Sequence, residues 1–316
     1  MAYAIQTEGL TKEFVSVSSA RVTVALKDLT LQVEEGEIFG FLGPNGAGKT
    51  TTIKILLGLI FPTAGRAWVL GKDIWDTAVK YDLAFVPDSP YFYDFLTAEE
   101  LLRFYGGLFG LKGSILDKRI EELLELVGMT HARGRRLREY SRGMFQRVGI
   151  AQALVNDPKV LLLDEPTSGL DPIAQREVRD IILKLRERGK TVLLCSHHLS
   201  DVERISDRVA ILNRGKLERM GRLDDLLAAE RVEIAAEGLS EEATRKITDL
   251  AEESKVIAGR VTAYDSRRDV INAIIDTIRG AKGELISVIP QRQTLEDLFV
   301  RIVQQEEPAA VSEESR

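Results

Sequence analysis

Alternating apolar and polar positions in the first part of the chain predict a series of short strands. The stretches YAIQTEGL, VTVALKDLTLQV and EIFGFLG carry apolar and β-branched residues between turn signals, as strands with a buried face do. Helical spacing follows from Lys49 to Ile60 and again between Thr97 and Val155. In that second region one helix opens with a capping box from Thr97 to Glu100, and the next ends at Gly128. The pattern predicts a helical insert within a unit that begins with strands.

Strands and helices alternate again from Lys159 onward. The runs VLLL and TVLLC are continuously apolar, which is typical of strands buried on both faces of a parallel sheet. A helix with the sequence MFQRVGIAQALV precedes the first of these runs, and the helix IAQREVRDIILKLRERG lies between the two. The order indicates an α/β fold.

A second unit is predicted after Ala229. Its strands and helices follow in the order βαββαβ with one more helix at the end, which matches a small ferredoxin-like α+β domain. The polar, acidic end of the chain has no periodicity and is predicted to be disordered. We therefore expect a first domain over 1–229 with its helical part at about 89–155, an accessory domain over 230–303 and a tail over 304–316.

Composition narrows the class of protein. The chain has 316 residues, 44% of them hydrophobic and 29% charged, and no apolar run approaches the roughly 20 residues that cross a bilayer. The start MAYAIQTEGL lacks the features of a secretory signal, and the single Cys195 cannot form an intrachain disulfide. We expect a cytoplasmic setting. A net charge of −6 argues against nucleic acid as a partner, although the basic stretch HARGRRLR departs from that average.

The segment GPNGAGKT, Gly43 to Thr50, predicts a phosphate-binding loop. It fits the pattern G-x-x-x-x-G-K-[ST] directly after a predicted strand and before a predicted helix. Its three glycines allow successive N–H groups to turn toward phosphate oxygens at a helix N-terminus. Lys49 is expected to neutralise the β and γ phosphates, and the Thr50 hydroxyl to bind Mg²⁺.

A pair of adjacent carboxylates ends the strand VLLLDEP. Taken alone, Asp164 and Glu165 are more simply surface acids at the end of a strand. With the phosphate-binding loop upstream, Asp164 is placed to hold Mg²⁺ through water, and Glu165 to polarise an attacking water. An acid in that position suggests hydrolysis of the nucleotide.

Six motifs together resemble the nucleotide-binding subunit of an ATP-binding-cassette (ABC) transporter, over about Tyr3 to Ala229. In family order they are GPNGAGKT, FVPD, YSRGMFQR, LLLDEP, SGLD and CSHH. The resemblance implies a P-loop ATPase fold, which has a RecA-like core, an antiparallel β subdomain and a helical signature subdomain. It implies ATP and Mg²⁺ as cofactors, with the metal held by Thr50, Asp164 and, through water, Asp88. The nucleotide contacts that it implies are Phe14, stacked on the adenine, Gly43, Pro44, Asn45, Gly46, Ala47, Gly48, Lys49, Thr50, Thr51, Asp88, Ser141, Arg142, Gly143, Met144 and Asp171.

The resemblance also assigns the switch histidine and shows two departures. His197 matches the switch position and is expected to act with Glu165 and Lys49 in catalysis, whereas His198 is expected to be an ordinary partly buried or surface imidazole. Asp88 stands where the family has glutamine, and its charge would repel the γ-phosphate. Arg142 replaces the first signature glycine, and it either adds a positive charge at the nucleotide or points to solvent. Phe14 has a simpler alternative as a core phenylalanine.

The function that the resemblance implies is ATP hydrolysis coupled to transport. Two copies, or one copy and a related ATPase, would close around two Mg-ATP molecules and drive a separate transmembrane permease on the cytoplasmic face of the membrane. The accessory domain favours export. Aromatic residues concentrated in SPYFYDFLTAEELLRFYGGLF fit a groove that receives a helix of the permease, with core packing as the alternative for about half of them. Two other functions remain open, a soluble ABC-type ATPase with a non-membrane partner and a regulatory module that binds ATP without hydrolysing it.

Overall fold

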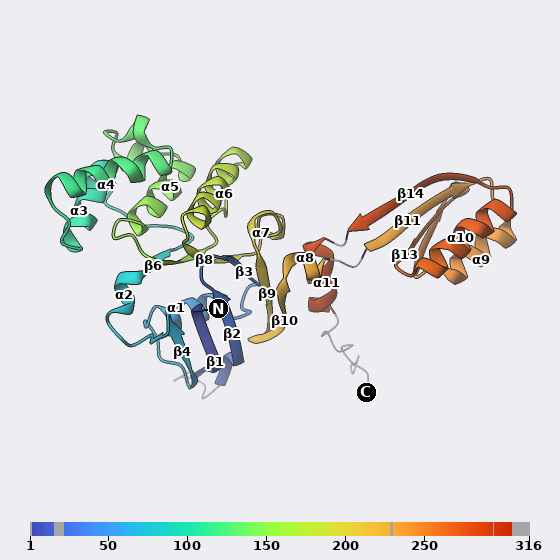
Figure 1. Cartoon of the computed structure of the whole chain (residues 1–316), viewed down its shortest axis with the longest axis horizontal. Helices are drawn as coiled ribbons and strands as arrows, with labels where there is room; N and C mark the ends of the chain where they lie inside the picture. The colour runs from blue at the N-terminus through green and yellow to red at the C-terminus, as the bar shows by residue number, and fades with distance from the viewer. Residues whose placement is uncertain (1, 16–21, 228–229, 293, 305–316) are drawn as a thin grey trace, which may run out of the picture. The chain divides into compact units, whose positions relative to one another are not determined.

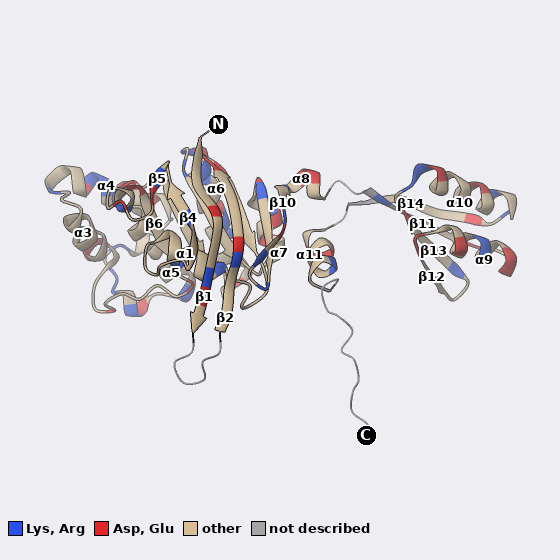
Figure 2. Ribbon diagram, turned by 90° about the horizontal axis from the view of Figure 1, so that it is seen from below, with Lys and Arg blue, Asp and Glu red and all other residues tan. Residues whose placement is uncertain are grey.

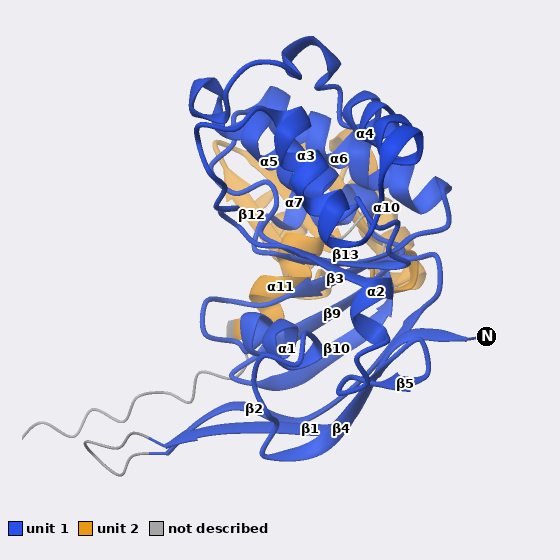
Figure 3. Ribbon diagram, turned by 90° about the vertical axis from the view of Figure 1, so that its left-hand side faces the viewer, with its two compact units in different colours: residues 1–223 blue, residues 224–316 orange. Residues whose placement is uncertain are grey.

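The computed structural model describes residues 2–15, 22–227, 230–292 and 294–304, and they form two compact units. The units are Met1–Leu223 and Asp224–Arg316, shown in two colours in Figure 3. The expected domain boundary after Ala229 falls at residues 228 and 229, outside the described part, as do residues 305–316 of the expected tail. Among the described residues no helix is long and apolar enough to span a membrane.

Unit 1 contains an antiparallel sheet of four strands in the order β2-β1-β4-β5. The strands are β1 (Tyr3–Val15), β2 (Val22–Glu34), β4 (Ala64–Val69) and β5 (Lys72–Asp73). The two long strands pair along almost their whole length and bury an apolar residue at about every second position of their inner parts, Leu29, Leu31 and Val33 among them. Strands were expected here because of that alternation.

The second sheet of unit 1 has six strands in the order β10-β9-β3-β8-β7-β6. They are β3 (Ile38–Leu42), β6 (Leu83–Val86), β7 (Val160–Asp164), β8 (Thr191–Ser196), β9 (Arg208–Asn213) and β10 (Lys216–Arg222). Five strands run parallel, and β10 pairs antiparallel at one edge. Every residue of β3 and β8 is buried, which confirms the expectation of a parallel sheet covered on both faces.

Helix α1 (Lys49–Leu56) is shorter than its sequence pattern predicts. The apolar spacing continues to Ile60, but Gly58 takes a left-handed conformation with φ of 66°. A Cβ at Gly58 would lie 2.9 Å from Lys80 Nζ, and this ammonium donates to the carbonyl of Leu57 at 2.6 Å. The helix therefore stops where a lysine from α2 (Val79–Asp82) satisfies a carbonyl at its end.

A group of helices fills the expected insert. It contains α3 (Ala98–Leu108), α4 (Gly113–Leu126), the short 3₁₀ turns η1 (Thr130–Ala132) and η2 (Leu137–Glu139), and α5 (Arg142–Ala153). The capping box between Thr97 and Glu100 is present at the start of α3, and Gly128 has a positive φ just beyond α4. Helix α5 begins at Arg142, two residues before the predicted start at Met144, because Ser141 caps it. In Figure 1 these helices gather beside α6 (Pro172–Glu187).

Unit 2 contains one antiparallel sheet in the order β12-β13-β11-β14, and helices α9 and α10 pack beside it (Figure 1). Its elements in chain order are α8 (Leu223–Leu226), β11 (Glu230–Glu237), α9 (Glu241–Leu250), β12 (Glu253–Ile257), β13 (Arg260–Asp265), α10 (Arg268–Gly280), β14 (Glu284–Arg292) and α11 (Leu295–Gln304). Its core joins Ile234 of the sheet to Ile247 of α9 and Ile274 of α10. Basic and acidic residues are interspersed along the outer parts of both helices (Figure 2), as on an ordinary solvated surface.

Candidate functional site

Four segments with predicted chemistry meet at one edge of the parallel sheet. The phosphate-binding loop follows β3, His197 follows β8, Asp164 ends β7, and Asp88 comes two residues after β6. These four strands are neighbours and run parallel, so their carboxyl ends lie side by side. In open α/β sheets ligands bind at this edge.

The phosphate-binding loop needs its glycines for two separate reasons. Gly48 has φ of 108°, and a Cβ there would lie 2.6 Å from the carbonyl oxygen of Ala25. At Gly43 a Cβ would lie 2.6 Å from the carbonyl oxygen of Leu212. The loop is thus pressed between β2 and β9, which leaves its N–H groups at the N-terminus of α1 as a concave anion site.

Lys49 is the cation of this loop. Its side chain is buried, and Nζ donates to the carbonyl oxygens of Gly43 at 2.6 Å and Pro44 at 3.4 Å. The side chain of Lys49 therefore extends back toward the start of the phosphate-binding loop. In this position a phosphate held by the loop N–H groups would have a positive charge beside it.

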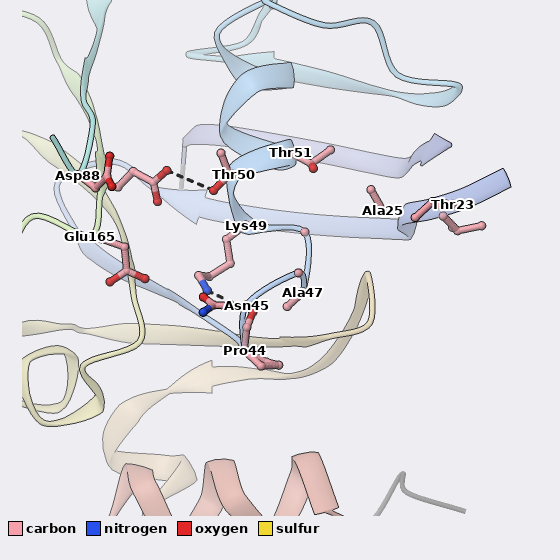
Figure 4. A pocket seen from close by; sticks show the side chains of 14 residues that line it. Thr23, Ala25, Pro44, Asn45, Ala47, Lys49, Thr50, Thr51, Asp88 and Glu165 are labelled. Carbon is pink, nitrogen blue, oxygen red and sulfur yellow. Dashed lines mark hydrogen bonds between the residues drawn. The ribbon is translucent and has the colours of Figure 1, made fainter. Parts of the chain in front are cut away.

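Thr50 and Asp164 lie close enough to share a divalent cation. The Thr50 hydroxyl donates to Asp164 Oδ2 at 3.3 Å, shown as a dashed line in Figure 4. Burial raises the pKa of Asp164, the carboxylates of Glu165 and Asp88 add to that effect, and the hydrogen bond from Thr50 opposes it. Hydroxyl and carboxylate oxygens suit Mg²⁺. No group of three or more His, Cys, Asp or Glu fit to hold a metal occurs in the described part of the chain.

Glu165 and His197 form a second pair beside the carboxylate of Asp164. Glu165 Oε2 lies 2.8 Å from His197 Nδ1 and accepts from the His197 N–H at 3.1 Å. The Glu165 N–H donates to the Cys195 carbonyl at 2.8 Å, and its φ is 50°. A non-glycine residue in this left-handed region stores strain, so the carboxylate is held in place by its surroundings. The ring of His198 lies against that of His197 with centroids 4.3 Å apart, and its side chain is partly buried, as expected.

A pocket of about 530 Å³ joins most of the predicted residues. Figure 4 shows Asp88 and Glu165 on the side opposite Thr23 and Ala25, with Lys49 and Thr50 between them. The lining contains the loop from Pro44 to Thr51 together with Asp88, Asp164 and Glu165. It also contains three residues of β2 that the sequence motifs did not indicate, Thr23, Val24 and Ala25. Their contribution depends on the pairing of β2 with β1, for which no local motif exists.

Phe14 lies next to this pocket without lining it. It pairs with Thr23 across β1 and β2, its side chain is 44% exposed, and Lys12 Nζ lies 5.0 Å from its ring centroid. An exposed ring is a poor core residue but can stack on a base. Adenine stacking at Phe14 stays a prediction.

The signature residues gather at a second place, where α5 and α6 begin. Ser141, Arg142, Gly143, Met144 and Asp171 are absent from the lining of the pocket. Ser141 Oγ accepts from the Met144 N–H at 3.3 Å and caps α5. The Asp171 carboxylate accepts from two N–H groups at the start of α6, each at 3.0 Å. The start of α6 is already occupied by the Asp171 carboxylate, whereas the start of α5 is capped by a neutral hydroxyl and still favours an anion. These residues are separate from the pocket that contains the phosphate-binding loop.

A buried ion pair links two helices that begin near the site, α6 after Asp171 and the helix that follows the two histidines. Arg179 of α6 pairs with Asp201 of α7 (Leu199–Ile205), and their side chains are only 13% and 7% exposed. The second carboxylate oxygen of Asp201 has no hydrogen-bond partner among the described residues. This pair connects the helix after Asp171 to the helix after His197, and the sequence motifs did not indicate it.

Replacing Asp201 with Asn should strongly destabilise unit 1. The change leaves Arg179 buried without a compensating charge, and breaking a buried pair in this way costs about 3 kcal/mol of the free energy of unfolding. Urea titration followed by circular dichroism measures the loss. Asp180→Asn is the matched control, because Asp180 pairs with Arg176 on the same helix with side chains 56% and 78% exposed, and exposed pairs contribute less than about 1 kcal/mol. Equal losses in the two variants would show that burial of the Arg179–Asp201 pair is unimportant.

Comparisons with known proteins agree with this geometry. A family model described as ABC transporter matches residues 26–168. An ABC transporter ATP-binding protein of Synechocystis sp. is 46% identical over 281 residues, which cover 88% of this chain and 78% of the relative. The Nod factor export ATP-binding protein I of Cupriavidus pinatubonensis is 32% identical over 290 residues, 90% of this chain and 87% of that protein. Among solved structures, the dimeric ATP-binding cassette MJ0796 in a post-hydrolysis state with ADP and Pi matches with a TM-score of 0.62 and 28% identity, over 69% of this chain and 98% of that one.

Proposed function

Because this chain belongs to the ATP-binding proteins of ABC transporters, which are ATPases, we propose that it hydrolyses Mg-ATP to drive export through a separate membrane subunit. One observation carries the catalytic part of this proposal. The Glu165 carboxylate, held by His197 at 2.8 Å, lines the same pocket as Lys49 and the phosphate-binding loop. A base next to a phosphate cradle can activate water for attack on the terminal phosphate.

The roles of the site residues follow from their positions. The loop N–H groups and Lys49 hold the phosphates, and Thr50 and Asp164 hold Mg²⁺, which neutralises charge on the phosphate oxygens when bound. Glu165 takes the proton from water, and His197 keeps the carboxylate in place through its Nδ1 and N–H contacts. Asp88 lines the pocket, where its charge would repel the γ-phosphate, so we assign it a water-mediated approach to the metal rather than a contact with the phosphate.

We propose that the active form is a dimer, of two copies or with a related ATPase. Ser141 and Gly143 lie at the start of α5, outside the pocket that contains Lys49. A second copy related by a twofold axis supplies these groups to the ATP of the first, and receives the same in return. Support comes from the dimeric state of the similar cassette MJ0796.

The membrane partner is proposed to be a transmembrane permease, which places the chain on the cytoplasmic face of the membrane. Five aromatic residues around the turn after Asp88 and helix α3 are at least 38% exposed, and we call them the aromatic surface: Tyr91, Tyr93, Phe95, Phe104 and Phe109. Phe92 and Tyr105 are partly buried and pack against each other edge to face at 6.4 Å. The surface suits a helix with apolar side chains. Export, rather than import, is supported by the Nod factor export relative.

Unit 2 is proposed to be an accessory domain of the ferredoxin-like type, over about 230–303. Its strand order β12-β13-β11-β14 and its order of elements along the chain fit that topology. Residues 1–229 then form the ATPase domain, with its helical subdomain at about 89–155.

Co-purification of this chain with a membrane protein, sought first among proteins encoded beside it, tests the proposed partnership. The double variant Tyr93→Ser, Phe95→Ser should lose most of the bound permease, because truncating aromatic anchors in an interface costs about 2 kcal/mol or more each. ATP binding should be unaffected. Phe61→Ser is the control, since Phe61 is 71% exposed and stacks on Trp75 outside the aromatic surface. Retention of the permease by the double variant would contradict the assigned docking surface, and the absence of any membrane protein in the wild-type preparation would contradict the transport function.

A further inference from the structure

The Arg142 side chain lies on the SGLD turn, Ser168 to Asp171, of its own chain. A Cβ placed on Gly169 would lie 2.6 Å from Cζ of Arg142, so the guanidinium occupies the space that any side chain at 169 would need. Gly169 also has φ of 65°, which disfavours other residues. Arg142 is thus exposed to solvent while its guanidinium lies against Gly169, and it does not line the nucleotide pocket of its own copy.

Two further contacts hold α5 against α6, both further along these helices than the contact between Arg142 and Gly169. A Cβ on Gly143 would lie 2.6 Å from Cβ of Ala174, which shows how closely the two helix starts approach. One turn further on, Arg147 Nη1 lies 3.5 Å from Glu177 Oε2. Helix α5 is thus joined to the SGLD turn through Arg142 and to α6 through Gly143 and Arg147.

The SGLD turn is in turn continuous with Glu165. The Ser168 N–H donates to the Glu165 carbonyl at 3.1 Å, and the Leu170 N–H donates to the Thr167 carbonyl at 3.3 Å. These bonds make residues 165–170 one folded segment, which ends where Asp171 caps α6. Glu165 itself has a left-handed backbone with φ of 50°, which its surroundings must hold, so the position of its carboxylate depends on how this segment is folded.

No carboxylate pairs with Arg142 within the described ranges of the chain. Its planar guanidinium rests on a peptide backbone instead, a packing that the weakly hydrated group tolerates well and that an ammonium would not reproduce. A glycine at 142 could not make this contact.

From these contacts we propose that Arg142 is a positioning residue, which couples the signature segment to the SGLD turn and so sets the position of Glu165. This inference rests on the proposed function, in which Glu165 activates water and the signature receives the nucleotide of a second copy. When that nucleotide engages Ser141 and Gly143, the guanidinium transmits the movement of α5 to residues 165–170.

A double-mutant cycle in the full-length chain tests the coupling. Arg142→Ala removes the guanidinium, and Gly169→Ala displaces it, so each should lower kcat for ATP hydrolysis by roughly tenfold to a hundredfold with the KM for ATP unchanged. Because both changes break one contact, the combined variant should be no slower than the slower single variant. Arg142→Lys should recover only part of the rate. Gly189→Ala is the control for backbone strain, since Gly189 has φ of 76° and its Cβ would meet nothing within 4 Å.

Several outcomes would overturn the inference. Multiplicative losses in the double variant, or wild-type kcat in Arg142→Ala, would show that the contact carries no coupling. A raised KM, or loss of ATP-dependent dimers when Arg142→Ala is added to Glu165→Gln, would make Arg142 a direct nucleotide contact instead. Failure of the proposed function has a different signature, because the unmodified chain would then show no ATP turnover and Glu165→Gln alone would form no dimer, and the inference would fall with it.

Discussion

Replacing Glu165 with Gln should reduce ATP turnover by at least about a hundredfold, since loss of a general base removes a rate factor of about 10²–10⁴. Glutamine has the same shape, and its amide oxygen can still accept from His197, which lies 2.8 Å away through Nδ1. What it loses is the ability to take a proton. The phosphate-binding loop, Lys49 and Thr50 are untouched, so ATP should bind with normal affinity.

The oligomeric state of the Glu165→Gln variant is more informative than its loss of turnover. With ATP bound but not cleaved, the proposed dimer should accumulate, and light scattering under saturating Mg-ATP should report twice the mass of the ligand-free chain. Turnover is measured in parallel by phosphate release. Glu187→Gln provides the control, because Glu187 is exposed at the end of α6. A monomer under saturating ATP would contradict the dimer, and normal turnover would remove Glu165 from the catalytic role.

The positions of helices and strands along the chain could be predicted, because each depends mainly on residues that are close together in the sequence. The run of apolar residues in VLLL and TVLLC corresponds to strands whose interiors are completely buried, and the capping box at Thr97 begins a helix. Lys49, Asp164 and Glu165 came together because parallel neighbours place their carboxyl ends at one edge. For these residues, motif and strand order were sufficient.

Contacts between distant segments could not be predicted in the same way. Helix α1 ends early because Lys80, from a different helix, reaches the Leu57 carbonyl. Thr23 enters the pocket through strand pairing, and Asp201 meets Arg179 through helix packing. For Arg142 the sequence left two alternatives, a charge at the nucleotide or a solvent-exposed side chain. In the structure Arg142 is exposed, as in the second alternative, but its guanidinium also lies against Gly169 of the same chain, a contact that depends on the packing of α5 on α6.

Replacing Lys49 with Met should weaken ATP binding by about a hundredfold or more. The buried stem of Lys49 keeps its packing in this variant, but the ammonium that donates to Gly43 and Pro44 is lost. A charge-assisted hydrogen bond contributes about 1.5–3 kcal/mol, and this amine is placed to make more than one with the phosphates. The loop N–H groups remain and would bind the nucleotide weakly by themselves.

Binding of a fluorescent ATP analogue measures the loss, and thermal unfolding without nucleotide confirms that the fold survives. Lys54→Met is the matched control, since Lys54 lies on the same helix with an exposed side chain. Because the Lys49 charge acts on the phosphates whereas the Phe14 ring would act on the base, the variant should also lose its preference for ATP over AMP. Unchanged affinity with an unchanged ATP preference would exclude this loop as the phosphate site, even if Glu165 proved essential for turnover.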